Sequence, residues 1–331
     1  MNKNIIFFVS SMNGGAENQL YNLFKLLKND NKTRYLVAKG ANSNPNIISL
    51  NKRKTFFAIF GLIKEIIKFK PDILFTTLPT PNLLNVLIKK IGFFKYRSVC
   101  RIANYNINLN TTKFIIKNSD IIYFNSVENL NIYAEAFPKY KNKFVYLNNI
   151  INSDKKNISK LSTKRKIKAL TASRLVKNKG IDLAIKAMNE ISNKDIFLDI
   201  YGEGEEAENL KLISTNPNTI FKGYLNNLNE LWESYNLFLL PSRKEGMSNA
   251  LIEAQFNNVY SIVSDCKTGN KEVIGLTNNG MCFKTDDYLE LKNSILQFYG
   301  TEMVSRNSRK IIIENFSEEN AKTVLRRTLG I

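Results

Sequence analysis

The chain has 331 residues, enough for two domains of ordinary size, and 44% of them are hydrophobic, enough to bury two cores. It contains no histidine, which excludes histidine-based catalytic triads, a histidine base and histidine metal ligands. Its three cysteines (Cys100, Cys266 and Cys282) are far apart and in no metal-binding spacing, which argues against a disulfide framework or a zinc site and fits a reducing compartment.

Positive charge is concentrated in the first half of the chain. The formal net charge is +19; residues 1–150 hold 22 Lys and Arg against 7 Asp and Glu, and the remaining residues hold 26 against 22. Such an asymmetry describes the partners of a protein rather than its fold. Nucleic acid, anionic lipid and a phosphate-bearing substrate are the three candidate partners.

The chain begins with a short apolar segment, residues 5–9, which resembles the core of a signal peptide. It is too short for one, and no small-residue cleavage site follows, so we interpret it as a buried strand. No stretch reaches the ~18 to 20 uncharged residues that a membrane-spanning helix needs. We therefore expect a soluble or membrane-peripheral protein.

Short apolar runs alternate with amphipathic stretches of helical length, which is typical of βα units around parallel sheets. In the first half we expect strands near residues 4–9, 34–38, 73–76, 98–102, 121–125 and 143–147. Helices are expected near residues 16–28, 55–69, 82–91, 111–118 and 126–136.

A polar, lysine-rich segment, residues 153–168, is interpreted as a linker, after which the pattern restarts. Further strands are expected near residues 167–173, 196–201, 220–223, 237–240 and 261–264, and helices near 181–191, 205–213, 302–314 and 317–329. The sequence thus predicts two doubly wound, Rossmann-like α/β domains, residues 1–152 and 153–315. Ligands of such domains bind at the C-terminal ends of the strands, so we expect the site in the cleft between the domains.

The strongest functional signal lies in residues 239–254, where a buried strand leads through a polar turn into a helix. Ser248 and Asn249 are good helix N-caps, and the N-terminal end of such a helix attracts anions. Gly246 lets the backbone approach a ligand, and the carboxylate of Glu253 can accept hydrogen bonds from two ribose hydroxyls. The alternative is an ordinary strand–turn–helix with a solvated glutamate.

A second strand–loop–helix segment, residues 171–180, carries Arg174 and Lys179 in its loop. Two fixed cations can neutralise a diphosphate, and arginine offers a planar fork of donors. The chain lacks an Asp-x-Asp pair after a strand, with which transferases usually hold a metal, so cations of the protein would replace that metal. The alternative is two surface cations without a ligand.

Glycines follow two other predicted strands. Tyr201-Gly202-Glu203-Gly204 lacks the full G-x-G-x-x-G pattern, which favours a tight turn over a nicotinamide-binding loop. Gly14-Gly15 opens a helix without the Gly-Lys-Ser/Thr of a Walker loop. Its backbone N–H groups can face a phosphate or a sugar, or the pair can serve turn geometry only.

Taken in the order in which they occur along the chain, these motifs resemble those of the retaining glycosyltransferases of family 4, which have the GT-B fold. The resemblance extends over residues 5–283. It rests on the E-x7-E pair Glu245 and Glu253, the R-x4-K pair Arg174 and Lys179, and the glycine motifs at Gly14-Gly15, Gly202 and Lys222-Gly223-Tyr224.

The resemblance implies a role for each of these residues. Arg174 and Lys179 would hold the diphosphate of a nucleotide sugar, Glu253 would hold its ribose, and Glu245 would hold the hydroxyls of the donor sugar. The remaining donor-binding residues would be Gly15 from the N-terminal domain and, from the C-terminal domain, Gly202, Tyr224, Gly246, Met247, Ser248 and Asn249. The N-terminal domain would bind the acceptor, and the last helix, residues 316–331, would cross back to it. A UDP-sugar is the expected donor, and no metal or other cofactor is implied.

One departure from the family concerns a histidine that many members carry in the N-terminal domain near the donor sugar. The equivalent stretch here, residues 99–106, offers Asn104 or Arg101, and neither is a good base near neutral pH. In a front-face retaining mechanism the departing diphosphate can take the acceptor proton. We therefore expect Asn104 to act with Glu245, Arg174 and Lys179 as the catalytic residues.

Aromatic residues accompany the positive charge of the first half. Phe56 and Phe57 follow Lys52-Arg53-Lys54, and Phe93 and Phe94 lie within a second basic segment, residues 89–97. Such patches suit an anionic bilayer, or single-stranded nucleic acid, or the aromatics belong to the core. The resemblance favours the membrane, because such enzymes often extend sugars on lipid carriers. We expect a cytoplasmic protein at the inner face of the membrane that does not bind nucleic acid.

The sequence thus predicts a retaining hexosyl- or N-acetylhexosaminyltransferase that builds a bacterial surface glycan, such as capsule, O-antigen or lipooligosaccharide. Its acceptor would be a glycan or an undecaprenyl-diphosphate-type lipid. Nucleotide-sugar 2-epimerases share the fold but rely on acidic and histidine residues that this chain lacks. The missing histidine also motivates an alternative, a catalytically silent nucleotide-sugar-binding subunit that partners an active transferase.

Overall fold

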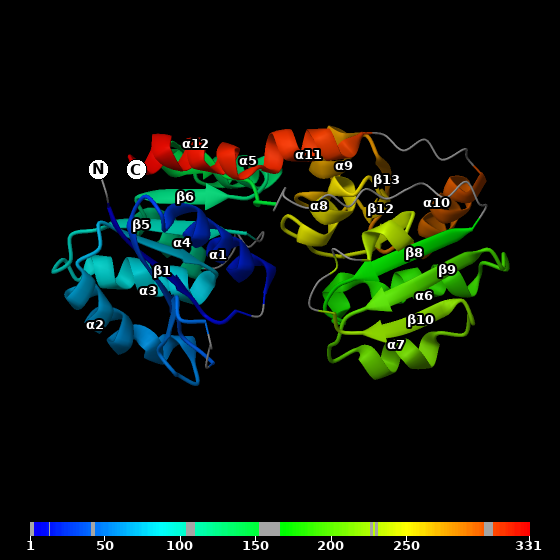
Figure 1. Ribbon diagram of the computed structural model, residues 1–331, viewed down its shortest axis with the longest axis horizontal. Helices are drawn as coiled ribbons and strands as arrows, with labels where there is room; N and C mark the ends of the chain where they lie inside the picture. Colours follow the sequence, from blue (N-terminus) through cyan, green and yellow to red (C-terminus); the bar gives the residue numbers. More distant parts are fainter. Residues whose placement is uncertain are drawn as a thin grey trace. The chain divides into compact units, whose positions relative to one another are not determined.

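The computed structural model describes residues 3–12, 14–40, 44–103, 110–151, 166–225, 228, 231–300 and 307–331 (Figure 1). The chain divides into two compact units, the first made of Met1–Ile150 with Phe316–Ile331 and the second of Ile151–Asn315. In the described part of each unit, parallel strands form a sheet with helices on both faces. The predicted fold class, two Rossmann-like α/β domains, is confirmed.

The described residues of the first unit form a seven-stranded parallel sheet in the order β3-β2-β1-β4-β5-β6-β7. The strands are β1 (Asn4–Val9), β2 (Lys32–Val37), β3 (Ile47–Ser49), β4 (Ile73–Thr77), β5 (Arg97–Ile102), β6 (Ile121–Phe124) and β7 (Phe144–Tyr146). The helices are α1 (Gly15–Leu27), α2 (Ile59–Phe69), α3 (Pro79–Lys90), α4 (Asn110–Asn118), α5 (Val127–Ala136) and α12 (Glu318–Leu329).

The strand order of this sheet reverses between β1 and β4, and the reversal decides which face each helix covers. Crossovers between parallel strands are right-handed, so connections that run in opposite directions lie on opposite faces. α1 packs on Ile5, Phe7 and Val9, whereas α2 to α5 pack on the other face, which includes Ile6 and Phe8. Among the described helices of residues 1–150, only α1 covers the first face.

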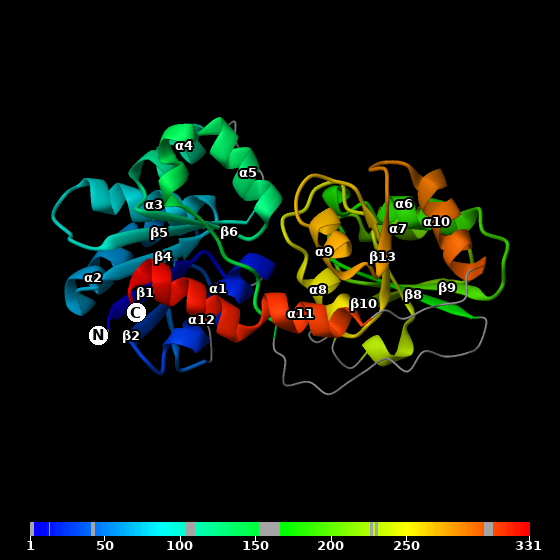
Figure 2. The same cartoon turned by 90° about the horizontal axis from the view of Figure 1, so that it is seen from above.

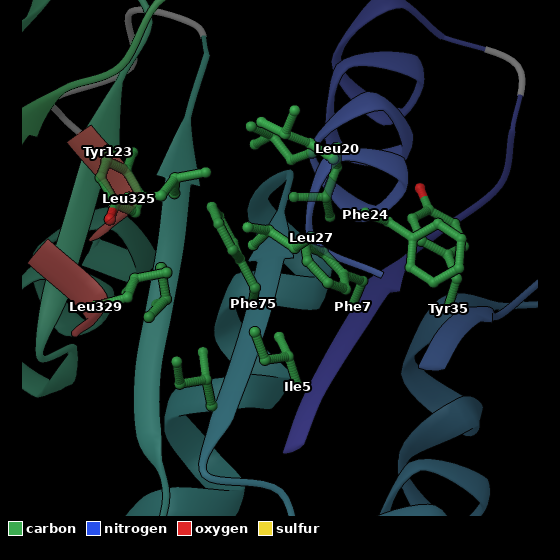
Figure 3. Packing of buried hydrophobic residues seen from close by; sticks show 14 of the residues in the cluster. Ile5, Phe7, Leu20, Phe24, Leu27, Tyr35, Phe75, Tyr123, Leu325 and Leu329 are labelled. Atoms are coloured by element: carbon green, nitrogen blue, oxygen red, sulfur yellow. The ribbon is translucent and has the colours of Figure 1, made fainter. Parts of the chain in front are cut away.

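The last helix, α12, completes the cover of that face. Leu325 and Leu329 pack in one buried cluster with Tyr123 and the side chains of α1 (Figure 3), and α12 lies beside α1 (Figure 2). The hydroxyls of Thr328 and Tyr123 are hydrogen-bonded, and Arg97 donates to the carbonyl oxygens of Thr328 and Leu329 at 3.0 and 3.2 Å. The end of the chain is therefore part of the core of the first unit.

The described residues of the second unit form a six-stranded parallel sheet in the order β10-β9-β8-β11-β12-β13. The strands are β8 (Ile167–Ala172), β9 (Ile196–Tyr201), β10 (Thr219–Gly223), β11 (Leu237–Leu240), β12 (Tyr260–Ser264) and β13 (Gly280–Phe283). The helices are α6 (Ile181–Asn189), α7 (Ala207–Ile213), α8 (Asn249–Phe256), α9 (Asn270–Thr277), α10 (Tyr288–Gly300) and α11 (Ser308–Phe316). Helices α6, α7 and α10 share one buried cluster, and α8 and α9 pack on β11 to β13.

Some elements differ from the sequence-based expectations. The sequence predicts neither β3 nor β13, because these short edge strands (Ile-Ile-Ser and Gly-Met-Cys-Phe) are not continuous apolar runs, whereas the equally short edge strand β7 (Phe-Val-Tyr) is apolar throughout and is predicted. It also leaves α9 and α10 unassigned. Helix α3 begins at Pro79, before its expected start, because proline suits the first turn of a helix, where an N–H is not needed. The expected linker, residues 153–168, lies almost entirely outside the described residues.

Two further properties bear on function. None of the helices in the described ranges is both long and apolar enough to cross a membrane. The three cysteines are free thiols, and Cys100 is fully buried in the first sheet. Burial raises the pKa of the Cys100 thiol, so it remains protonated at neutral pH.

The contribution of α12 to the first unit can be tested with Leu325→Ala. Loss of this fully buried side chain should lower the free energy of unfolding by about 3 kcal/mol, because the core cannot close the resulting cavity. Thr323→Ala is the matched control, since Thr323 is exposed on the same helix, and it should change stability by less than about 0.5 kcal/mol. Urea unfolding followed by circular dichroism measures both, and equal midpoints would show that α12 is dispensable to the core.

Candidate functional site

The two segments that the sequence singles out meet at the carboxyl edge of the second sheet. The strand order reverses between β8 and β11, which are hydrogen-bonded neighbours. Ligands of parallel α/β sheets bind at such a reversal, beyond the carboxyl ends of the strands. The loop after β8, residues 173–180, and the loop after β11, residues 241–248, therefore lie side by side at the expected ligand edge.

An ion pair joins these loops. Nζ of Lys179 lies 2.5 Å from Oε1 of Glu245, and the Ser242 hydroxyl donates to the same oxygen at 2.8 Å. The side chains of Lys179 and Glu245 are 17% and 9% exposed, so the pair is largely removed from water. Removing one partner of such a pair leaves the other charge uncompensated. Two predicted site residues, one from each segment, are thus in direct contact.

Arg243 holds the two loops together, and nothing in the sequence patterns singles it out. Its guanidinium donates two hydrogen bonds to the carboxylate of Asp182, at 2.7 and 2.8 Å, and its backbone N–H donates to the carbonyl of Asn178 at 2.9 Å. Burial by itself would raise the pKa of Asp182, but the hydrogen bonds and charge of Arg243 outweigh it and lower that pKa. Arg243 therefore fixes the loop of Glu245 against the loop of Lys179.

Two glycines allow the close approach of the backbone around the site. Gly180, with a φ of +64°, is the N-cap of α6, and a Cβ there would lie 1.9 Å from the carbonyl oxygen of Pro241. Gly202, with a φ of +140°, follows β9, and a Cβ there would lie 1.8 Å from the carbonyl oxygen of Ser173. Both positions therefore require glycine for packing. A ligand contact at Gly202 stays a prediction.

Helix α8 begins shortly after Glu245 in the sequence, and its N-terminal end lies at the same carboxyl edge of the second sheet. Ser248 is its N-cap, because its hydroxyl accepts a hydrogen bond from a first-turn N–H at 3.3 Å. Gly246 and Met247 are buried in the preceding turn. Asn249 and Glu253, four residues apart, share a half-buried side of α8. The carboxyl edge thus combines a helix N-terminus, cations and carboxylates, which suits a ligand with phosphates and hydroxyls.

The remaining predicted residues are less closely connected. Arg174 is exposed near the start of the loop after β8. Tyr224 is 64% exposed and follows the edge strand β10, with β9 and β8 between it and β11, so the structure does not bring it to the ion pair. In the first unit, Gly15 is exposed at the start of α1. Asn104 lies outside the described residues.

Two further observations concern the acidic side chains and the thiol near the site in the described part of the chain. There, no group of three or more Cys, Asp and Glu side chains is placed to hold a metal ion. Cys266 lies near the ion pair, but burial raises the pKa of its thiol and the Glu245 carboxylate raises it further. Cys266 is therefore a protonated thiol rather than a nucleophile.

Comparisons with known proteins identify the family. The family model described as Glycosyl transferases group 1 matches residues 152–318, just over half of the chain. An uncharacterized glycosyltransferase of Haemophilus influenzae is 24% identical over 323 residues, which cover 87% of this chain and 88% of that protein. A Campylobacter jejuni N-acetylgalactosamine-N,N'-diacetylbacillosaminyl-diphospho-undecaprenol 4-alpha-N-acetylgalactosaminyltransferase is 28% identical over 216 residues, which cover 62% of this chain and 58% of that enzyme.

A solved structure of similar fold is Anabaena HepE in complex with UDP-glucose. The two chains superpose with a TM-score of 0.83 at 15% identity, over 99% of this chain and 100% of HepE. At this identity the likeness shows the fold, which is the two-domain GT-B fold of glycosyltransferases. Together with the family match over half of its length, this shows that the chain belongs to the glycosyl transferases group 1.

Proposed function

We propose that the protein is a retaining glycosyltransferase of family 4 that moves a sugar from a UDP-sugar to a glycan or a lipid-linked acceptor, in the synthesis of a bacterial surface polysaccharide. The observation that carries the proposal is the contact of Lys179 with Glu245 at the switch point of the second sheet. A nucleotide sugar has phosphates, which a cation and a helix N-terminus can bind, and hydroxyls, from which carboxylates can accept hydrogen bonds. The name of the Campylobacter relative, which acts on a diphospho-undecaprenol-linked sugar, and the UDP-glucose complex of HepE support this choice of substrates.

In this proposal the second unit binds the donor. Lys179 and Arg174 neutralise the diphosphate, Glu253 accepts hydrogen bonds from the ribose, and the backbone of residues 246–249 surrounds the phosphates and sugar. Because Lys179 is already paired with Glu245, a bound diphosphate places the donor sugar beside that carboxylate. The carboxylate can then accept hydrogen bonds from the sugar hydroxyls. Contacts of Gly15 and Tyr224 with the donor follow from the family resemblance.

The proposed transfer uses the donor as its own base. The bond between the anomeric carbon and the diphosphate oxygen breaks, and the acceptor oxygen bonds to the same face of that carbon. The acceptor proton passes to the departing diphosphate oxygen, and Lys179 and Arg174 stabilise the charge that develops there. No histidine is needed for these steps, and Asn104 stands where many family members carry one.

The alternative is a nucleotide-sugar-binding subunit without activity of its own. The absence of histidine from the chain favours it, whereas the contact between Lys179 and Glu245 favours an enzyme. Release of the nucleoside diphosphate by the purified chain, in the presence of a membrane lipid extract as acceptor, supports the enzyme. Donor binding without release supports the subunit.

The donor site can be tested with Lys179→Ala and Glu253→Ala. Each removes a charged partner of the diphosphate or the ribose, so we expect the affinity for the preferred nucleotide sugar to fall about ten- to a hundred-fold. A thermal-shift screen against UDP-, GDP-, ADP- and CMP-sugars first identifies the base, and titration calorimetry then measures the affinities. Lys177→Ala is the matched control, because it removes an exposed lysine from the same loop and should not change the affinity. Unchanged affinity in both site variants would refute the assignment.

We also predict that the donor site works without a divalent metal. Fixed cations of the protein neutralise the diphosphate in this proposal, so EDTA should change neither the affinity for the nucleotide sugar nor the rate of transfer. The measurement is the thermal shift and the rate of nucleotide release with EDTA, and again after addition of magnesium. Activity that EDTA abolishes and magnesium restores would contradict the prediction.

We further propose that the basic first unit docks on an anionic membrane from its cytoplasmic side. Phe56, Phe57 and Phe60 are 52%, 57% and 77% exposed, beside the exposed cations of residues 52–54. Phe93 is 85% exposed, so the alternative that these aromatics belong to the core fails for Phe56, Phe57 and Phe93; it holds for Phe94, which packs against the core. Exposed rings next to lysines suit the interface of an anionic bilayer.

Replacement of Phe56, Phe57 and Phe60 by serine should weaken binding to vesicles that contain phosphatidylglycerol about tenfold or more, because three apolar anchors are lost. Leu212→Ser is the control, since Leu212 is 81% exposed but lies in the second unit. Vesicle co-sedimentation measures the binding. An equal effect of the control, or equal binding to neutral phosphatidylcholine vesicles, would speak against this surface.

A further inference from the structure

Arg101 is a buried charge that the proposed donor site does not use. It stands one residue before the end of β5 and is 1% exposed. Alternation along the strand puts it on the same face of the sheet as Val99, which belongs to the cluster under α1 and α12. Fully buried arginines are uncommon, because hydrogen bonds and an opposite charge must replace the lost water.

The hydrogen bonds of Arg101 are incomplete. Its Nη2 donates to Oδ1 of Asn149 at 2.5 Å, whereas Nε and Nη1 meet no acceptor within the described part of the chain. Among the described residues, no carboxylate raises the pKa of Arg101, and burial lowers that pKa to about 10. The hydrogen bond that Glu17, the buried acid of α1, accepts at 3.4 Å comes from Ser11 and not from Arg101. The segment that follows β5 in the sequence, residues 104–109, contains no Asp or Glu that could pair with Arg101.

The backbone around Arg101 is held in place. The side chain of Asn82 donates to the carbonyl oxygen of Arg101 at 3.0 Å. Beside Asn149, the acceptor of Arg101, the side chain of Gln19 in α1 hydrogen-bonds both the N–H and the carbonyl of Ile150. An apolar residue such as methionine would fill the same space, and exchanging buried charges for apolar residues is often neutral or stabilising. Packing therefore does not explain why an arginine is here.

The location of Arg101 fits a ligand site. β5 adjoins β4, and the order of the first sheet reverses between β4 and β1, so Arg101 lies close to the edge at which such sheets bind ligands. We propose that Arg101 binds an anionic group of a substrate, a phosphate or a carboxylate, at the carboxyl edge of the first sheet. The anion supplies the acceptor oxygens and the negative charge that the guanidinium lacks. Arg101 belongs to the first unit and Lys179 to the second, so either assignment can fail without the other.

The test uses the full chain and inorganic phosphate, in a Lys179→Ala background that weakens the anion site of the second unit. Thermal stability is measured against phosphate concentration, with sodium chloride added to keep the ionic strength constant. We expect phosphate to raise the melting temperature of Lys179→Ala by about 2–4 °C, through binding to the folded state. The double variant Lys179→Ala/Arg101→Met should show no such shift.

A second measurement separates a ligand-binding arginine from a structural one. Without phosphate, Arg101→Met should melt at or above the temperature of the unmodified chain, because an uncompensated buried charge is gone. A melting temperature several degrees lower, or an equal phosphate response with and without Arg101, would overturn the proposal. The first result would make Arg101 a structural partner of Asn149.

The affinity of the single variant Arg101→Met for the nucleotide sugar shows whether the anion belongs to the donor or to the acceptor. An unchanged affinity for the nucleotide sugar, with the phosphate response lost, assigns the anion to the acceptor. An affinity about tenfold weaker, with the phosphate response also lost, assigns it to the donor diphosphate. The proposed donor-binding residues of the second unit are unchanged in this variant. If the donor-site proposal itself is wrong, the unmodified chain will already fail to bind the nucleotide sugar, so the two failures can be told apart.

Discussion

Right-handed crossover connections determine both where a ligand can bind and why the chain needs its last helix. In each sheet the chain winds outward from its first strand and then reverses to continue on that strand's other side. The reversal places the loops after β8 and β11 next to each other, and these loops carry Lys179 and Glu245. In the first sheet the same rule puts only α1, among the described helices of residues 1–150, on one face. α1 does not cover that face by itself, and α12 supplies the missing apolar surface.

The two units handle buried charge in different ways. In the second unit, Lys179 and Glu245 compensate each other, and Arg243 with Asp182 holds their loops in register. Such a preformed pair needs little rearrangement when a ligand with phosphates and hydroxyls arrives. In the first unit, Arg101 has one acceptor, Asn149, and two unsatisfied nitrogen donors among the described residues. A charge left in this state points to a group from outside the chain.

The sequence predicts what depends on local pattern and leaves out what depends on distant partners. Central strands such as β1 and β11 are continuous apolar runs, so they and the loops after them are found, and Lys179 and Glu245 with them. The short edge strands β3 and β13 give no such signal. The role of Arg243 depends on Asp182, 61 residues away in sequence, and the burial of Arg101 depends on how α1 and α12 cover the sheet. Neither contact leaves a mark in the local pattern.

The positive charge of the first half of the chain comes from exposed and buried cations, and the two kinds act differently. The cations of residues 52–54 are exposed beside Phe56 and Phe57, where their field extends over about one Debye length of ~8–10 Å and is weakened by salt. Together they can attract an extended anionic surface. Arg101 is 1% exposed and acts only on a group that touches it. The net charge of the sequence counts both alike, but the exposed cations explain attraction to a surface, whereas the buried arginine requires a specific anion in contact with it.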